Sequence, residues 1–410
     1  MKKKFILLWI GTITILVVGI ILMVIYFVWD YKKYEDKNII EIYDTKYQDV
    51  MVKDEEYLVD ELFLRLTESL ESYNEKNQTE YSLNDFTYAF EKNLFEITNQ
   101  GFIGKKAGQS KVYLDKVEEG VPAKTLRIIV GDFYVTDSTY TGFTKINTIS
   151  EFNDKIAENP QGRFILNADL DYQNQAFTPV SQFEGILINP HRFKIKNCIF
   201  ETQAQQYRIF GTGQQAFIEG IRFENCKVKI NDTHINSIAV YQSSSGTATL
   251  KNIHFSDIAI DTSDYTGKAL SVSFFESGSE AYQYLVNCSV ELNQTIAFAE
   301  EVKFFELKVF SEINYSKNCY TVLDITTNTD TEIYCFHQAR ALNSYCVVLG
   351  NSKAYTNFYG DDSIFAYGTE AGIWETQNPE TLDLEALKSG QKIAGLDEYV
   401  FEPGRYPYIA

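Results

Sequence analysis

Five short segments in the C-terminal part of the chain repeat one β-rich pattern with Asn or Asp at its centre. The segments begin at Ile195, Phe223, Phe255, Leu285 and Ser316, and their central residues are Asn197, Asn225, Asp257, Asn287 and Asn318. These central residues are 28, 32, 30 and 31 positions apart. A period near 30 that is built from strands predicts a β-solenoid, whose coils bury their strands only by stacking on neighbouring coils.

The side chains at the repeat centre suit the corners of such a coil. Asn tolerates left-handed backbone angles and its amide can bond to the Asn of the next coil, so we expect the five central residues to form one ladder. Four of them are followed by cysteine, which packs in a narrow interior as a small apolar side chain; these are Cys198, Cys226, Cys288 and Cys319. The chain's six cysteines form no CxxC pair, which favours reduced stack members over a metal site. A disulfide between neighbouring coils is the alternative, because stacked strands lie about 4.8 Å apart.

The fold class that we predict is mainly β, with a right-handed parallel β-helix preceded by an N-terminal transmembrane helix and a small α+β domain. The expected parts are a cytoplasmic stub and signal anchor at residues 1–30, a stalk at 31–45, the α+β domain at 46–142, and the β-helix with a C-terminal cap at 143–410. Helical spacing of apolar residues predicts one helix from Asp54 to Tyr73 and a second from Ser82 to about Gly101. Strands are expected at 112–114 and 125–130, and a short helix at 151–158 with Ser150 as its cap.

The first 30 residues carry the strongest signal for a membrane. Phe5 to Trp29 is an uncharged run of 25 residues, long enough to cross the hydrocarbon core as a helix, and three lysines precede it. The run ends in bulky residues rather than a small-residue cleavage site, which favours an uncleaved anchor. We therefore expect residues 5–29 to bind the lipid bilayer, with the acidic C-terminal domain outside the cell.

Several stretches around the first coils resemble a known family. Ile146–Phe152, Gly162–Leu170 and Phe183–Leu187 are similar to the first strands of bacterial surface β-helices with GLUG-type repeats, modules found in Gram-positive adhesins and beside surface metalloproteases. The match covers roughly residues 143–410 and is specific only to about residue 230; the turn at Pro190 to Phe193 lacks the family's glycine. The resemblance implies a non-catalytic module for adhesion or display.

The sequence offers no catalytic, cofactor or metal motif. None of the four histidines belongs to HExxH, and GxSxG, P-loop and dinucleotide-binding patterns are absent. Asp169, Asp171 and Glu184 lie close in sequence, but the two aspartates flank Leu170 and are expected to face solvent as ordinary surface acids. We predict no cofactor, and catalysis only as an alternative.

Aromatic residues are a further candidate for ligand binding. Tyr265, Phe275, Tyr282 and Tyr284 belong to an aromatic-rich region that either fills the core or presents rings to sugars or a partner protein. The net charge of −19 argues against nucleic acid as a partner. The sequence thus predicts a membrane-anchored extracellular protein acting as a non-catalytic scaffold for adhesion or binding to a glycan or surface protein. The alternatives are a β-helix carbohydrate-active enzyme, a polysaccharide lyase or hydrolase, and an envelope assembly or sensor component.

Overall fold

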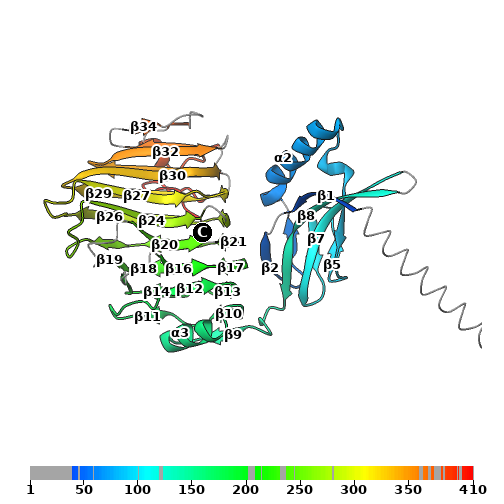
Figure 1. Cartoon of the computed structure of the whole chain (residues 1–410), viewed down its shortest axis with the longest axis horizontal. Coiled ribbons are helices and arrows are strands. Elements are labelled where there is room, and N and C mark those ends of the chain that lie inside the picture. The colour runs from blue at the N-terminus through cyan, green and yellow to red at the C-terminus, as the bar shows by residue number, and fades with distance from the viewer. Residues whose placement is uncertain are drawn as a thin grey trace, which may run out of the picture. The chain divides into compact units, whose positions relative to one another are not determined.

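The structure is a computed structural model of the 410-residue chain and is mainly β, with several stacked parallel sheets consistent with a β-solenoid (Figure 1). It describes residues 39–409 except for gaps at 45–46, 59, 100, 120–122, 202–207, 214, 231–236, 244, 279–280, 360–362, 368–370, 374–379, 382–383, 395 and 397–398. The predicted anchor at residues 5–29 lies outside the described residues. No helix in the described part of the chain is both long and apolar enough to cross a membrane.

The chain separates into two compact units. Unit 1 contains residues up to Thr45 and Asp54–Val135, and unit 2 contains Lys46–Lys53 and Thr136–Ala410. Segment Lys46–Lys53, which carries β2 (Gln48–Val52), therefore belongs to the same unit as the solenoid although it precedes most of unit 1 in sequence.

Unit 1 combines one helix with two small sheets. Its elements are β1 (Ile39–Asp44), β3 (Glu56–Leu58), α2 (Asp60–Asn77), a 3₁₀ turn η1 (Leu83–Asp85), β4 (Thr87–Phe90), β5 (Phe95–Ile97), β6 (Gly101–Gly104), β7 (Gly108–Glu118) and β8 (Lys124–Thr136). One sheet has the order β1-β8-β7-β4 and the other β3-β6-β5. The two predicted strands are confirmed as parts of β7 and β8.

The second predicted helix of unit 1 is wrong. Residues 82–104 instead form η1 and three short strands, because Phe86, Tyr88 and Phe90 follow a two-residue alternation that pairs with β7. Phe102 is fully buried among aromatic rings, 5.3 Å from Phe95 between ring centroids, so burial in a sheet decides the conformation.

The first predicted helix exists but begins later than expected. It starts at Asp60 and buries Leu66 and Leu70, whereas Asp54 adopts a left-handed turn with φ of 67° and Glu56 begins β3. Asp54 and Glu56, which fall within the predicted helix, therefore belong to a turn and a strand.

Unit 2 opens with β9 (Thr144–Ile146) and helix α3 (Ile149–Glu158) and then stacks strands into four walls. Wall 1 contains β9, β10 (Arg163–Leu166), β13 (Ile186–Ile188), β17 (Gln215–Glu219), β21 (Gly246–Lys251), β25 (Ala281–Val286) and β28 (Tyr315–Lys317). Wall 2 contains β11 (Leu170–Asp171), β14 (Lys194–Lys196), β18 (Arg222–Glu224), β22 (His254–Ser256), β26 (Ser289–Ile296), β29 (Tyr320–Thr327), β31 (Ser344–Gly350), β33 (Ser363–Tyr367) and β35 (Glu380–Thr381).

Walls 3 and 4 complete each coil. Wall 3 is short and contains β15 (Ile199–Glu201), β19 (Lys227–Lys229) and β23 (Ala259–Asp261). Wall 4 contains β12 (Val180–Phe183), β16 (Arg208–Thr212), β20 (Ser237–Ser243), β24 (Ala269–Ser277), β27 (Phe304–Ser311), β30 (Asp330–Leu342), β32 (Lys353–Tyr359) and β34 (Ala371–Ile373). All pairings within the walls are parallel, and helix α4 (Leu384–Leu387) lies in the C-terminal segment.

Helix α3 confirms the predicted short helix, but its cap is Thr148 and not Ser150. The Thr148 side chain accepts a hydrogen bond from the Glu151 backbone N–H at 3.2 Å, while Ser150 donates its hydroxyl to Asp154. Phe152 and Ile156 then point into the solenoid interior, so the helix closes the first coil.

The five central residues of the sequence repeat form two ladders, not one. At the corner between walls 2 and 3, Asn225 Nδ2 donates to Asn197 Oδ1 at 2.6 Å, and the strand register places Asp257 opposite Asn225. At the corner between walls 1 and 2, Asn318 donates to Asn287 at 3.0 Å, and Asn287 donates to Asn252 at 3.1 Å.

The expected left-handed angles are present at both corners. All five central residues have φ between 53° and 56°, and Asn252 has φ of 55°. Asp257 and Asn287, which are 30 positions apart, therefore lie at two different corners of the coil. Asn252 belongs to the same ladder as Asn287, although it was not part of the sequence repeat.

The core of unit 2 is a column of apolar and aromatic side chains. Rings in successive coils stack, as in Phe275 on Phe310 at 5.4 Å and Phe310 on Phe336 at 4.9 Å between centroids. All six cysteines are free and buried in this interior. They act there as small apolar side chains.

Candidate ligand groove

The corner that joins wall 2 to wall 3 is present after β22 and absent in β26, the next strand of wall 2. In the coils up to β23, a left-handed residue separates a wall 2 strand from a wall 3 strand, and Asp257 is the last of these. In the next coil β26 runs straight through the position of that corner as one eight-residue strand. Gln294 of β26 closes the end of wall 3, since its side chain accepts from the Ile260 N–H at 2.7 Å and donates to the Ile260 carbonyl at 2.6 Å.

The C-terminal segment covers part of the same face. Leu387, Leu396 and Tyr399 are buried against Tyr320 and Tyr345 of wall 2. Tyr320 and Tyr345 stack at 5.2 Å with an angle of 7° between the rings, and the Tyr345 hydroxyl donates to the Pro407 carbonyl. An apolar strip of wall 2 is thereby removed from water, and the polar residues beside it remain open.

A groove with a volume of about 570 Å³ lies between the C-terminal segment and the part of wall 2 where β26 replaces the corner seen at Asp257. Its polar side chains come from three coils and from the C-terminal segment, and they are Asp257, Glu291, Asn293, Gln294, Asp324, Lys388 and Tyr406. Asn293 pairs in register with Asp324, and Glu291 with Val322, so these side chains stand in rows on one face. The volume falls within the range of small-molecule sites.

Glu291 is the carboxylate whose ionisation the groove alters. Desolvation by the surrounding protein raises its pKa, and the nearby charge of Asp257 raises it further. The Tyr320 hydroxyl, which donates to Glu291 Oε1 at 3.0 Å, and Arg405 offset part of this rise. The side chain of Glu291 keeps an exposed surface, so a ligand in the groove can reach it.

The C-terminal segment supplies a cation and an aromatic ring to the groove. Lys388 Nζ lies 4.5 Å from the centre of the Tyr406 ring, where the ring face attracts a cation. Among the groups that the structure describes, none bonds to the buried hydroxyl oxygen of Tyr406.

A Ser–His contact beside the groove does not have the properties of a catalytic pair. His254 Nδ1 lies 2.8 Å from Ser289 Oγ, but Ser289 is 2% exposed and offers no room for a substrate. Burial, together with the charges of Arg222 and Arg192, lowers the pKa of His254 to about 4. A histidine with this pKa is a poor base near neutral pH, so the pair is structural.

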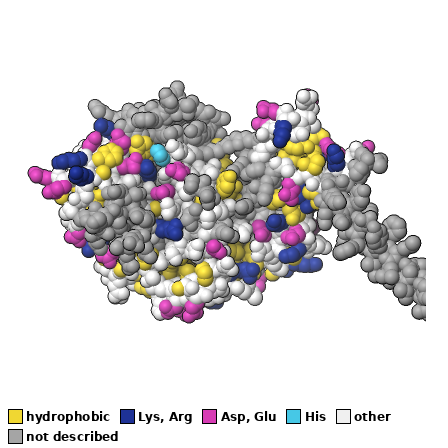
Figure 2. Space-filling model, in the orientation of Figure 1, with side chains coloured by type: hydrophobic (Ala, Val, Ile, Leu, Met, Phe, Trp, Pro, Cys, Tyr) yellow, Lys and Arg dark blue, Asp and Glu magenta, His cyan; other side chains and the backbone are white. Residues whose placement is uncertain are grey.

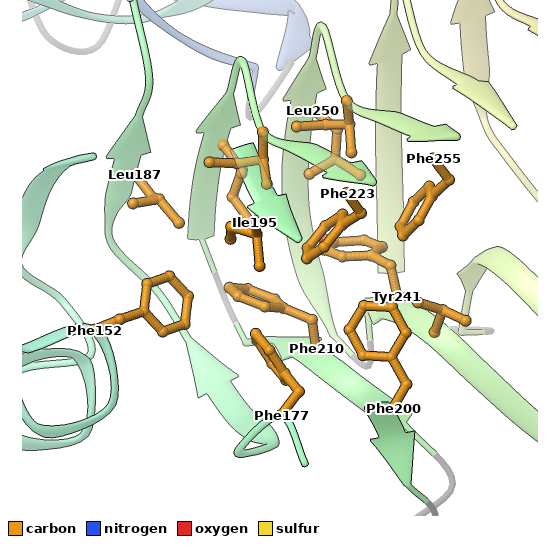
Figure 3. Close-up of a pocket in the computed structure, with 14 residues that line it drawn as sticks. Phe152, Phe177, Leu187, Ile195, Phe200, Phe210, Phe223, Tyr241, Leu250 and Phe255 are labelled. Atoms are coloured by element: carbon orange, nitrogen blue, oxygen red, sulfur yellow. The ribbon is translucent and has the colours of Figure 1, made fainter. Parts of the chain in front are cut away.

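A second pocket lies inside the solenoid and has no lining group that is suited to catalysis. Its volume is about 30 Å³, and its lining is apolar except for Tyr241, whose hydroxyl bonds to Thr212 at 2.9 Å. Figure 3 shows Phe152, Phe177, Phe210 and their neighbours pointing toward one another around it. It is a packing gap in the core, of a size that holds at most a water molecule.

Of the four aromatics named as possible ligand-facing residues, three are buried, so the alternative that they fill the core holds for these three. Tyr265 and Phe275 are 0% exposed and Tyr284 is 2% exposed, because Phe275 belongs to the interior ring stack and Tyr284 is covered by Tyr47 at 5.5 Å. Tyr282, at 48%, remains open to solvent. The solenoid interior therefore holds more aromatic volume than the sequence suggested.

The acids that the sequence singled out have structural partners. Asp169 accepts the Lys194 backbone N–H at 2.9 Å, and Asp171 accepts the Asn197 amide at 2.8 Å. Acidic and basic side chains are interspersed on the surface that Figure 2 shows. Within the described residues, no group of three or more His, Cys, Asp or Glu side chains could hold a metal ion.

The sequence carried one signal for the groove that was missed. In Ser289–Gln294, polar residues occupy alternate positions at Glu291 and Asn293, which marks an outward strand face. Nothing in the sequence links this strand to Lys388 and Tyr406, since they are about a hundred residues away.

Comparison with known proteins adds no relative. No family model, curated protein or solved structure matches this chain.

Proposed function

We propose that this chain is a membrane-anchored extracellular protein, a non-catalytic binding scaffold of the cell envelope whose groove binds a carbohydrate. The observation that carries the proposal is the groove formed by Glu291, Asn293, Asp324 and Tyr406. Sugar hydroxyls donate to carboxylates and both donate to and accept from amides, and an aromatic ring offers a surface for the apolar face of a sugar. The groove combines these three kinds of group.

The remaining features of the proposal come from the sequence. The uncharged run at residues 5–29 supports an anchor in the lipid bilayer, and the similarity to GLUG-type surface β-helices supports a right-handed solenoid displayed outside a Gram-positive cell. Protease treatment of intact cells tests this location. The solenoid should be digested while a cytoplasmic control protein survives; survival of the solenoid until the cells are lysed would contradict an external location.

Binding is tested with the purified full chain in detergent on an array of neutral and acidic oligosaccharides, including wall polysaccharide fragments. We expect binding that weakens at least tenfold in Asp324→Asn and Glu291→Gln, because each removes a charged acceptor from the groove. Glu301→Gln is the matched control, since Glu301 is exposed and does not line the groove. Equal binding by all three variants, or no binding to any glycan, would refute the proposal.

One observation favours a second function, a glycoside hydrolase. A carboxyl with a raised pKa can act as a general acid, and Glu291 has Asp257 as a carboxylate neighbour. Release of reducing ends from a bound oligosaccharide would support hydrolysis if Glu291→Gln abolished it. Binding without release supports the scaffold.

A further inference from the structure

The six buried cysteines fall into three pairs by contact. Cys198 with Cys226 and Cys288 with Cys319 join successive coils, and Cys335 of wall 4 meets Cys346 of wall 2 across the interior. Each cysteine thus has one thiol neighbour. The first pair is defined best, since the two sulfur atoms lie 2.8 Å apart.

The backbone around Cys198 and Cys226 has the geometry that a disulfide requires. Ile199 pairs with Lys227 in parallel register, so the two cysteines occupy equivalent positions in adjacent coils. Neighbouring strands lie about 4.8 Å apart, and cysteine Cα atoms in disulfides are usually about 4.4–6.8 Å apart. The register and the contact between the sulfur atoms therefore place the two cysteines within reach of a disulfide bond.

We propose that Cys198 and Cys226 are a disulfide site that links two coils of the solenoid once the chain meets a disulfide oxidant. The oxidant is a small-molecule disulfide or a thiol–disulfide exchange protein. One cysteine thiolate attacks the oxidant's S–S bond to form a mixed disulfide and release one thiol. The second thiolate then attacks the cysteine sulfur and releases the other thiol, so the chain loses two hydrogens and the oxidant gains them.

The folded structure indicates when this reaction occurs. Both cysteines are 1% exposed, so an oxidant reaches them while the coils are still assembling. In the folded state the Cys198 thiol donates toward Cys226 Sγ, so the two sulfur atoms meet as soon as the two coils stack. The proposal is independent of the groove and its ligand.

The test refolds the full chain from the reduced, denatured state in a buffer of reduced and oxidised glutathione. Free thiols are then alkylated, and the protein is digested with trypsin without reduction. Cys198 lies in the peptide 197–208 and Cys226 in the peptide 223–227. We expect one disulfide-linked species of these two peptides, with a mass lower by two hydrogens than their sum.

Two variants keep the result decisive. In Cys198→Ser, the peptide 223–227 should be recovered fully alkylated, and the thermal midpoint should no longer differ between oxidised and reduced protein. The double variant Cys198→Ala/Cys226→Ala reports by circular dichroism whether the coils still assemble without the bond. Recovery of both wild-type peptides in alkylated form, or linkage of either cysteine to any other cysteine, would overturn the proposal.

Discussion

Asn287 holds three coils together at one corner through its side-chain amide. It donates to Asn252 of one neighbouring coil and accepts from Asn318 of the other, with φ of 56°. A residue at this position must tolerate a left-handed backbone and also bond in both directions along the stack. Asn is suited to both requirements, which explains its recurrence at the corners.

Replacing Asn287 by alanine should therefore destabilise the solenoid. Asn287→Ala removes two side-chain hydrogen bonds. It also leaves at a positive φ a residue that, unlike Asn, has no amide to stabilise the left-handed conformation. We expect a loss of about 1–3 kcal/mol in the free energy of unfolding. Denaturant titration followed by circular dichroism measures it. Asn293→Ala, on the exposed face of β26, is the matched control and should change stability little. Equal effects of the two changes would contradict the ladder's contribution.

Glu291 makes stability depend on pH. Because its pKa is raised in the folded state, the folded protein binds a proton at this carboxyl more tightly than the unfolded chain does. The stabilisation from that proton is complete below the ordinary glutamate pKa of about 4.3 and is lost as pH rises through the raised value. Glu291→Gln should be more stable than wild type at pH 8, by less than about 1 kcal/mol since the side chain is partly solvated, and equally stable below pH 4.

Thermal melts of both proteins across pH 4–8 measure this difference. Glu301→Gln is the control and should show no such trend, because Glu301 is exposed outside the groove. A constant difference between Glu291→Gln and wild type at every pH would contradict the desolvation of Glu291.

At the scale of elements, the C-terminal segment packs on the outer face of wall 2 and shields part of it from solvent. Its buried residues Leu387, Leu396 and Tyr399 pack on Tyr320 and Tyr345, which point outward from the solenoid. In β31 the residues from Tyr345 to Leu349 form a continuous apolar run, which indicates a strand buried on both faces, but nothing local identified the segment that covers its outer face. The aromatic residues Tyr320 and Tyr345 are explained by the C-terminal segment, which packs against them in the folded structure.

Leu396→Ala tests the cover. Leu396 is 0% exposed, and deleting its side chain should cost about 2–5 kcal/mol and leave a cavity over wall 2. Ile393→Ala, which truncates a partly buried neighbour in the same segment, should cost clearly less. Urea unfolding of both variants supplies the comparison, and an undiminished midpoint for Leu396→Ala would show that the segment does not pack on the wall.

At the scale of the whole molecule, segment Lys46–Lys53 is part of the solenoid unit. Asp49 has a fully buried side chain that pairs with Lys251 of wall 1 at 2.9 Å and accepts from the Tyr47 hydroxyl at 2.7 Å. The two charged residues are 202 positions apart in the chain. The ion pair thus closes a very long loop, and its partners are specified only in the folded state.

Breaking this pair should be costly. Asp49→Asn keeps the side-chain shape but leaves the Lys251 charge without its buried counter-charge, for an expected loss of about 3–5 kcal/mol. Asp54→Asn is the control, since Asp54 is exposed and its pair with Lys105 at 3.4 Å is a surface contact worth at most about 1 kcal/mol. Differential scanning calorimetry of the two variants decides the matter, and similar midpoints for both would contradict burial of the pair.

The amino-acid sequence by itself determined that the C-terminal part stacks short strands, that its corners carry left-handed Asn residues, and that its cysteines face inward. These features are local, because each depends on a residue and its immediate neighbours in one coil. Tertiary structure decided which corner each repeat occupies, since Asp257 and Asn287 have similar surroundings in sequence but lie at different corners. It also decided the groove and the Asp49–Lys251 pair, because both join residues that are distant in the chain and meet only after the coils have stacked.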